Sequence, residues 1–443
     1  MDAQALSAER ASPLRGRAKP PGDKSISHRA LILALLSLGE TQIEGLLESS
    51  DVLATAAACA ALGAHVERRG AGRWHVRGCG IGSLLAPRET LDFGNSGTGL
   101  RLMMGVAGSH ALTVAFDGDT SLRKRPMERI LVPLCLMGAE VQSQAEGGRC
   151  PIVLKGTAEP VPIEYALPVP SAQVKSAILL AGLNVLGRTT VVEAIPSRDH
   201  TEKMLKHFGA SLKSEPLAAG GQKISLEGRP ELRPAPVTVP GDPSSAAFPL
   251  VAALIVPGSK IVIEGMMMNP LRTGLVKTLL GMGAAIDILD RRSEGGEEVA
   301  DLQVRACELH GTDVPASRAP SMIDEYPILA VAAAFARGAT RMRGLAELRV
   351  KESDRLSAIA AGLRAAGVGA EINGDDLIIE GRGGGEVAGG GLAVTHLDHR
   401  IAMSFLVLGL GSNRGMAVDD VGMIATSFPA FRELMENLGA NFR

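Results

Sequence analysis

Long apolar runs, each preceded by a short polar segment, recur along the chain. Apolar residues fill 30–38 after the polar stretch 20–29, and comparable runs occupy 176–186, 246–256 and 328–335. A helix that is apolar on every side is buried. These runs therefore predict inner helices whose first turns carry polar residues.

A second, amphipathic helix follows each inner helix and ends in a recurring signature: an apolar residue, a glycine and a small residue. The six glycines, spaced 71 to 84 residues apart, are Gly63, Gly138, Gly209, Gly283, Gly367 and Gly439. Glycine just past a helix end favours the left-handed conformation that terminates the helix. The chain thus contains six copies of one unit, whose inner helices we expect to begin near residues 24, 96, 171, 243, 323 and 397.

Strands are predicted between the helices. Residues 64–68 and 139–142 alternate between apolar and polar, and 189–192 and 260–263 are rich in β-branched residues. Both patterns indicate strands. Each unit is therefore mixed α/β, with strands outside and helices inside.

The ends and breaks of the pattern suggest how the units are grouped. A break at 239–242 leaves three units on each side. We expect the first 19 residues to be a frayed lead-in with one short strand. The glycine-rich segment 383–391 predicts a surface turn or flexible loop.

Composition narrows the function. The chain has 443 residues, enough for two to three domains, with 46% apolar and 21% charged residues. Aromatic residues make up only 3% and the net charge is −2, which argues against nucleic-acid and membrane-surface partners. The five cysteines include no C-x-x-C pair, which favours a reducing compartment over disulfides or zinc. With neither a secretory signal nor a run long enough to span a bilayer, we expect a cytoplasmic location.

The stretch 20–29, P-P-G-D-K-S-I-S-H-R, combines a chain break, helix caps and two cations. Asp23, Ser25 and Ser27 are candidate N-caps. A helix start favours anions, and Lys24 and Arg29 add full positive charges there. Taken alone, the stretch is better explained as an ordinary capped helix with a solvated lysine.

Seven further polar clusters stand at helix starts or in loops. They are 95–101, 123–126, 171–175, 198–202, 324–327, 351–355 and 398–400. Singly, each has a structural explanation: a glycine turn, a solvated charge run, an N-cap, an i,i+4 ion pair or a structural histidine. Asp324 could be only a cap, or a buried base with a raised pKa. Together, the clusters combine several Lys and Arg with a few carboxylates and no metal-ligand spacing. That combination favours a transferase that uses no metal or cofactor and acts on small, multiply anionic substrates.

These clusters resemble the motifs of the 3-phosphoshikimate 1-carboxyvinyltransferase family from about residue 20 to 442. The matching segments are G-D-K-S-I-S-H-R (22–29), N-S-G-T-G-L-R (95–101), K-R-P-M (124–127), S-A-Q-V-K (171–175), R-D-H-T-E (198–202), D-E-Y-P (324–327), R-V-K-E-S-D-R (349–355) and D-H-R (398–400). The resemblance implies two similar domains of three βαβαββ-like units each, an inside-out barrel with helices inside and sheets outside. The expected domains are 21–239, and 1–20 together with 240–443.

The resemblance also implies an activity, the transfer of the enolpyruvyl group of phosphoenolpyruvate to the 5-hydroxyl of shikimate 3-phosphate. It would proceed by addition and elimination, in a monomer. The implied catalytic residues are Asp324, Glu352 and Lys24. Those implied for phosphoenolpyruvate are Lys24, Gly97, Arg125, Gln173, Arg355 and Arg400. Those implied for shikimate 3-phosphate are Lys24, Ser25, Arg29, Ser171, Ala172, Gln173, Arg198, Asp324 and Lys351. The first domain would hold shikimate 3-phosphate and part of the phosphoenolpyruvate site, and the second the acid–base residues and the remaining arginines.

Some positions depart from the family pattern. Thr426–Pro429 stands where some members carry a lysine, and Asn269–Arg272 matches the N-x-T-R pattern of glyphosate-tolerant members imperfectly. Tolerant members can carry alanine where this chain has Gly97, so we expect a more glyphosate-sensitive enzyme.

Two alternatives remain. The related transferase that acts on UDP-N-acetylglucosamine uses a loop cysteine, and residues 119–125 contain none. A non-catalytic anion-binding repeat protein would not need Asp324 or Glu352.

Overall fold

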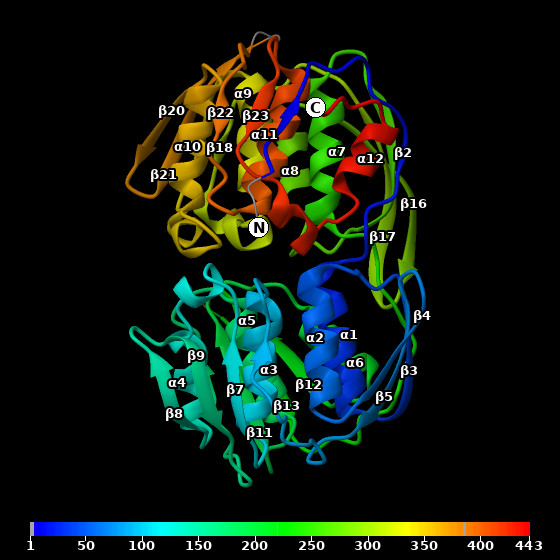
Figure 1. Cartoon of the computed structure of the whole chain (residues 1–443), viewed down its shortest axis with the longest axis vertical. Helices are drawn as coiled ribbons and strands as arrows, with labels where there is room; N and C mark the ends of the chain where they lie inside the picture. Colours follow the sequence, from blue (N-terminus) through cyan, green and yellow to red (C-terminus); the bar gives the residue numbers. More distant parts are fainter. Residues whose placement is uncertain (1–3, 219, 384–386) are drawn as a thin grey trace. The chain divides into compact units, whose positions relative to one another are not determined.

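The computed structural model describes residues 4–218, 220–383 and 387–443. The chain divides into two compact units (Figure 1). The central unit is Gly22–Val239, and the terminal unit is Met1–Pro21 together with Pro240–Arg443. Each unit is described by itself.

The described residues of the central unit form six α-helices and three four-stranded sheets. The helices are α1 (Lys24–Leu36), α2 (Ser50–Ala61), α3 (Gly97–Gly108), α4 (Glu128–Leu136), α5 (Ala172–Gly182) and α6 (His200–His207), with a 3-10 turn η1 (Leu122–Lys124). The strands are β3 (Leu38–Glu44), β4 (His65–Gly70), β5 (Arg73–Cys79), β6 (Leu91–Asp92), β7 (Thr113–Asp117), β8 (Glu140–Ala145), β9 (Arg149–Lys155), β10 (Glu164–Ala166), β11 (Arg188–Glu193), β12 (Leu212–Pro216), β13 (Gln222–Glu227) and β14 (Val237–Thr238). The sheet orders are β14-β3-β5-β4, β6-β7-β9-β8 and β10-β11-β13-β12.

The terminal unit repeats this plan. Its helices are α7 (Pro243–Ile255), α8 (Gly274–Gly281), α9 (Tyr326–Phe335), α10 (Arg355–Ala365), α11 (His399–Gly411) and α12 (Phe431–Asn437), with 3-10 turns η2 (Ala316–Ser321), η3 (Ala346–Val350) and η4 (Gly422–Thr426). Its strands are β1 (Leu6–Ala8), β2 (Arg15–Ala18), β15 (Lys260–Met267), β16 (Ala285–Glu294), β17 (Glu297–Arg305), β18 (Asp313–Val314), β19 (Arg337–Met342), β20 (Gly369–Asn373), β21 (Asp376–Arg382), β22 (Leu392–Ala393) and β23 (Met416–Val418). The sheet orders are β16-β17-β15-β2, β18-β19-β21-β20 and β1-β23-β22.

The repeated unit is a βαβαββ motif, most plainly in β6-α3-β7-α4-β8-β9. Its first two strands pair in parallel and the others pair antiparallel. All the sheets formed by the described strands are open and separate, so those strands form no closed barrel. In each unit of Figure 1 the sheets lie at the periphery and the long helices lie inside. The prediction of a mixed α/β repeat with inner helices is confirmed.

Helix ends follow the glycine pattern closely. Each outer helix ends two residues before its signature glycine. All six glycines have positive φ, from 79° at Gly367 to 114° at Gly63. The left-handed conformation that glycine adopts without a Cβ clash ends each helix and redirects the chain into the next strand.

The inner helices are packed on every side. Every residue of α7 and of α9 is buried, as is α1 from Ile26 onward. A second set of glycines lets the sheets approach these helices. A Cβ on Gly78 would lie 1.9 Å from the carbonyl oxygen of Ala34, and one on Gly156 would lie 2.1 Å from that of Ala107. Only glycine therefore allows the strand end to pass the carbonyls at the end of the inner helix.

Several local expectations were wrong. Asp23 caps α1, accepting a hydrogen bond from the backbone N–H of Ile26 at 2.8 Å, whereas Ser25 and Ser27 lie inside the helix. The fifth and sixth inner helices begin at Tyr326 and His399, two or three residues later than expected. Helix α5 ends at Gly182, so the apolar run to 186 extends beyond it.

The N-terminal segment forms two strands instead of one. Strand β1 pairs with β23, and β2 pairs in parallel with β15. Both strands complete sheets of the terminal unit, so they are anchored by pairing with segments far away in sequence. In the predicted loop 383–391, residues 384–386 lie outside the described part, and Val387 and Gly389 are buried.

Candidate active site

In the central unit, the starts of the inner helices are joined by polar contacts. Arg101 of α3 donates from Nη1 to Oε1 of Gln173 on α5, at 2.7 Å. The Gln173 amide in turn donates to Oγ1 of Thr98 at 2.9 Å. Ser171, next to Ala172 at the first turn of α5, caps that helix by accepting from the N–H of Val174 at 3.4 Å. Two predicted site segments, 95–101 and 171–175, are therefore neighbours.

Arg125 occupies a buried position beside the start of α3. Its side chain donates from Nη2 to Oδ1 of Asn95 at 2.6 Å and from Nη1 to the Asn95 carbonyl at 3.2 Å. Arg125 is only 5% exposed, so the solvated-charge explanation is wrong for this residue. It does fit Arg123, whose side chain is half exposed and pairs with Asp117 at the surface. A Cβ on Gly97 would lie 2.9 Å from Nη1 of Arg125. Gly97 therefore sets how closely this guanidinium approaches the helix start.

Lys24 and Arg29, at the start of α1, are both held by the protein. Lys24 forms an ion pair with the buried Asp51 in the first turn of α2. Arg29 is 3% exposed, and its Nε donates to Oγ1 of Thr201 at 2.7 Å. Its Nη1 donates to the carbonyl oxygen of Ser25 at 2.9 Å, which places Ser25 and Arg29 one turn apart as expected.

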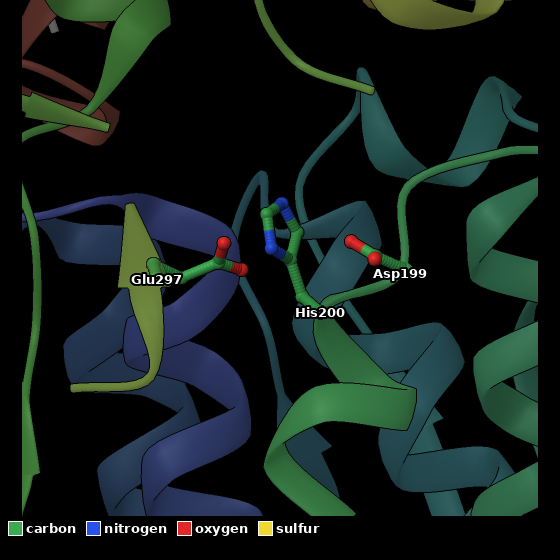
Figure 2. Close-up of side chains that lie close together, drawn as sticks. All are labelled: Asp199, His200 and Glu297. Carbon is green, nitrogen blue, oxygen red and sulfur yellow. The ribbon is translucent and has the colours of Figure 1, made fainter. Parts of the chain in front are cut away.

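Arg198 lies in the loop that leads into α6. It is partly buried, and Asp199 and His200 follow it at the helix start (Figure 2). Glu297, the third residue drawn in Figure 2, belongs to the terminal unit, where it begins β17. There its carboxylate accepts from Nδ2 of Asn269 at 3.2 Å.

The terminal unit is organised around Arg355, whose side chain is completely buried. Nε donates to Oδ2 of Asp398 at 2.8 Å, and Nη1 donates to Oδ1 of Asp324 at 3.3 Å. Nη2 lies 2.5 Å from Oε2 of Glu352. Burial alone would lower the pKa of Arg355, but the surrounding Asp398, Glu352 and Asp324 raise it above its usual value. One permanently charged guanidinium thus holds the two predicted acid–base residues.

Asp324 is surrounded by cations. Lys351 places Nζ 3.4 Å from its Oδ1, and Arg400 donates from Nη1 to its backbone carbonyl at 3.2 Å. Glu325, and not Asp324, is the N-cap residue of α9. The alternative that Asp324 is only a helix cap is therefore wrong. Its side chain keeps 16% exposure and is therefore not sealed inside the unit.

Several supporting residues were not predicted as site residues. Asp51, Asn95 and Asp398 are the buried partners of Lys24, Arg125 and Arg355. Asn95 and Asp398 did stand in the recognised segments 95–101 and 398–400, whereas no pattern in the sequence singled out Asp51. Lys175, which stands in the predicted cluster 171–175, is wholly buried. The residues that hold the site cations are thus harder to predict from the sequence than the cations themselves.

Each unit therefore presents helix starts with Lys and Arg side chains, and the terminal unit adds two carboxylates. Helix N-termini and guanidinium groups bind phosphate and carboxylate groups. Carboxylates held among cations can accept and return protons. The arrangement suits group transfer between small anionic molecules.

Comparisons with known proteins agree with this chemistry. The family model for EPSP synthase (3-phosphoshikimate 1-carboxyvinyltransferase) matches residues 8–435. The chain is 64% identical over 439 residues to the 3-phosphoshikimate 1-carboxyvinyltransferase of Methylorubrum populi, a match that covers 99% of this chain and 97% of that protein. It is also 61% identical over 437 residues to the 3-phosphoshikimate 1-carboxyvinyltransferase of Rhodopseudomonas palustris. That match covers 99% of this chain and 98% of the other protein.

Solved structures give the same result. An EPSP synthase from Acinetobacter baumannii superposes with a TM-score of 0.88 at 42% identity, covering 99% of both chains. The enolpyruvyl transferase NikO from Streptomyces tendae shares the fold, with a TM-score of 0.75 at 19% identity. The superposition with NikO covers 100% of this chain and 99% of the NikO chain. Among the described residues, no helix combines the length and apolarity needed to cross a membrane.

Proposed function

The chain belongs to the EPSP synthase (3-phosphoshikimate 1-carboxyvinyltransferase) family, and from this we propose that it transfers the enolpyruvyl group of phosphoenolpyruvate to the 5-hydroxyl of shikimate 3-phosphate. Phosphate is the second product. The observation that carries the proposal is the buried Arg355, which contacts both Asp324 and Glu352. We further propose that the enzyme works as a cytoplasmic monomer.

Phosphoenolpyruvate carries a phosphate and a carboxylate, and we assign Lys24, Arg125, Arg355 and Arg400 to these groups. Gly97 and Gln173 line the same site in this assignment. The assignment is supported by how the two cations of the central unit are held. Arg125 is fixed by a hydrogen bond to Asn95, and Lys24 by an ion pair with the buried Asp51. A fixed cation needs little reorganisation when the anion binds, so more of the binding energy is retained.

Shikimate 3-phosphate is assigned to residues at the starts of α1, α5 and α6. They are Lys24, Ser25, Arg29, Ser171, Ala172, Gln173 and Arg198, with Asp324 and Lys351 from the terminal unit. The contact of Arg29 with Thr201 ties α1 to α6, and its contact with Ser25 holds the side chain along the first turn of α1. Hydroxyl groups and cations together match a sugar-like ring that carries a phosphate.

The proposed reaction begins with removal of a proton from the 5-hydroxyl by Asp324. The resulting oxygen forms a bond to C2 of phosphoenolpyruvate while Glu352, assisted by Lys24, delivers a proton to C3. This addition gives a tetrahedral intermediate. The C3 methyl group then loses a proton, the C2–C3 double bond re-forms, and phosphate leaves with the electrons of the C–O bond. Cations that neutralise the departing phosphate favour this second step.

The test is phosphate release from phosphoenolpyruvate with shikimate 3-phosphate, with UDP-N-acetylglucosamine, and without either acceptor. We expect release only with shikimate 3-phosphate. Asp324→Asn should slow it by roughly 10²- to 10⁴-fold, the usual contribution of a general base. The matched control is Asp313→Asn, because Asp313 is half exposed and pairs with Arg343 at the surface. Release with UDP-N-acetylglucosamine, or equal rates in the two variants, would contradict the assignment.

A further inference from the structure

A buried cluster of charges lies in the central unit beyond the residues assigned to the substrates. Lys175 of α5 is wholly buried between two glutamates. Its Nζ donates to Oε2 of Glu193 at 2.9 Å and lies 2.7 Å from Oε1 of Glu202. It also donates to the backbone carbonyl of Ser197 at 3.3 Å.

The three partners of Lys175 bracket one loop. Glu193 is the last residue of β11, Glu202 lies in the first turn of α6, and Ser197 is in the loop between them. The hydroxyl of Ser197 also donates to Oε1 of Glu193. Lys175 therefore fixes the beginning, the middle and the end of segment 193–202. Arg198, assigned above to shikimate 3-phosphate, follows Ser197 directly in this segment.

The cluster also connects to Arg29. Ser176, which follows Lys175 on α5, accepts from Nη2 of Arg29 at 2.7 Å and contacts Oγ1 of Thr201 at 2.7 Å. Thr201 precedes Glu202 in α6. Arg29 is thus held against α6 by contacts that adjoin those fixing Ser197, the residue before Arg198.

The charges inside the cluster do not balance if all three groups are ionised. One ammonium would then face two carboxylates that are at most 5% exposed. Besides its contact with Lys175, Glu193 also accepts a hydrogen bond from Nε2 of Gln222 at 2.8 Å. Burial raises the pKa of Glu202 above its ordinary value, and this effect outweighs the opposing influence of Lys175. Glu193 is thus held by Lys175, Ser197 and Gln222, whereas Lys175 is the charged partner of Glu202.

We infer that Lys175, Glu193 and Glu202 are positioning residues for shikimate 3-phosphate, because they fix loop 194–199 and hence Arg198. This inference rests on the proposed function. It assigns a role to the lysine of S-A-Q-V-K and the glutamate of R-D-H-T-E, which contact each other in the structure although they are 27 residues apart in sequence.

The test compares steady-state kinetics of the wild-type enzyme with Lys175→Met and Ser197→Ala. Methionine keeps the length of lysine but removes the charge, and Ser197→Ala removes only the hydroxyl contact to Glu193. We expect KM for shikimate 3-phosphate to rise about tenfold or more in Lys175→Met, the effect of misaligning one charge-assisted hydrogen bond. KM for phosphoenolpyruvate and kcat should change much less. Ser197→Ala should also raise KM for shikimate 3-phosphate. If Lys175→Met does not fold, the result for Ser197→Ala tests the positioning role by itself.

A matched control completes the test. Lys155→Met serves as this control, because Lys155 forms an exposed pair with Glu140 in the same unit, and it should leave all constants unchanged. An unchanged KM for shikimate 3-phosphate in both Lys175→Met and Ser197→Ala, in an enzyme active on that substrate, would overturn the positioning role alone. A wild-type enzyme without activity on shikimate 3-phosphate would overturn the proposed function and this inference together.

Discussion

The substitution Gly97→Ala should weaken substrate binding while leaving the free energy of unfolding almost unchanged. A Cβ there would lie 2.9 Å from Nη1 of Arg125 and 3.1 Å from Nη1 of Arg101. Ordinary contacts of a Cβ begin at 3.4 Å, so Arg125 must move by about 0.5 Å in Gly97→Ala. Its two hydrogen bonds to Asn95 fix the guanidinium, and such a shift misaligns it for an incoming anion.

The size of the effect follows from the contact that is disturbed. A hydrogen bond to a charged group contributes about 1.5–3 kcal/mol. Weakening one such contact to phosphoenolpyruvate by about 1.4 kcal/mol raises KM about tenfold. Alanine is a better helix former than glycine, and the φ of Gly97 is not positive, so the free energy of unfolding should stay within about 1 kcal/mol.

The assay is steady-state kinetics with each substrate varied in turn, together with inhibition by glyphosate. We expect KM for phosphoenolpyruvate to rise about tenfold, KM for shikimate 3-phosphate to stay constant, and the inhibition constant of glyphosate to rise at least as much. Gly281→Ala is the control, because a Cβ on Gly281 meets nothing within 4 Å. An unchanged inhibition constant in Gly97→Ala would refute this account of the position.

Two further predictions concern stability. Gly156→Ala should lower the free energy of unfolding by about 1–3 kcal/mol or more, measured by urea denaturation, because the new Cβ would lie 2.1 Å from the carbonyls of Ala107 and His110. Equal stability of Gly156→Ala and Gly281→Ala would contradict the close approach of strand and helix. Burial, followed by the charges of Lys24 and Arg29, lowers the pKa of His28 well below its usual value. Below about pH 6.5 the unfolded chain binds a proton that folded His28 rejects, so this residue lowers stability as the pH falls, by up to about 1.4 kcal/mol per pH unit. The difference between the pH profiles of wild type and His28→Gln isolates this slope from that of His110, and parallel profiles would argue against it.

The repeat could be predicted because each copy depends on a local backbone requirement. A glycine with positive φ must follow each outer helix, and six such glycines at regular spacing reveal the period. Burial of the inner helices follows in the same way from their unbroken apolar runs. Both properties are set by residues adjacent in sequence, so no alignment of distant segments is needed to see them.

The larger errors of prediction concern segments that depend on distant partners, unlike the small shifts at helix ends. Strand β2 exists because it pairs with β15, more than two hundred residues later, and nothing near residue 15 signals this. The burial of Lys175 is equally non-local, since only Glu193 and Glu202 make it tolerable. The site cations themselves were found through family motifs. The residues that hold them, such as Asp51 and Asn95, are acidic or amide side chains whose role depends on the folded contacts.

The most direct test of the account is the reaction run in deuterium oxide, with the enolpyruvyl product analysed by mass spectrometry. Addition followed by elimination passes through a methyl group at C3, so part of the product should carry deuterium at its vinyl carbon. Formation of this product should require shikimate 3-phosphate, and the substitution Glu352→Gln should suppress it. A product formed at the normal rate without deuterium, or phosphate released without shikimate 3-phosphate, would contradict the central claim that Asp324 and Glu352 catalyse enolpyruvyl transfer.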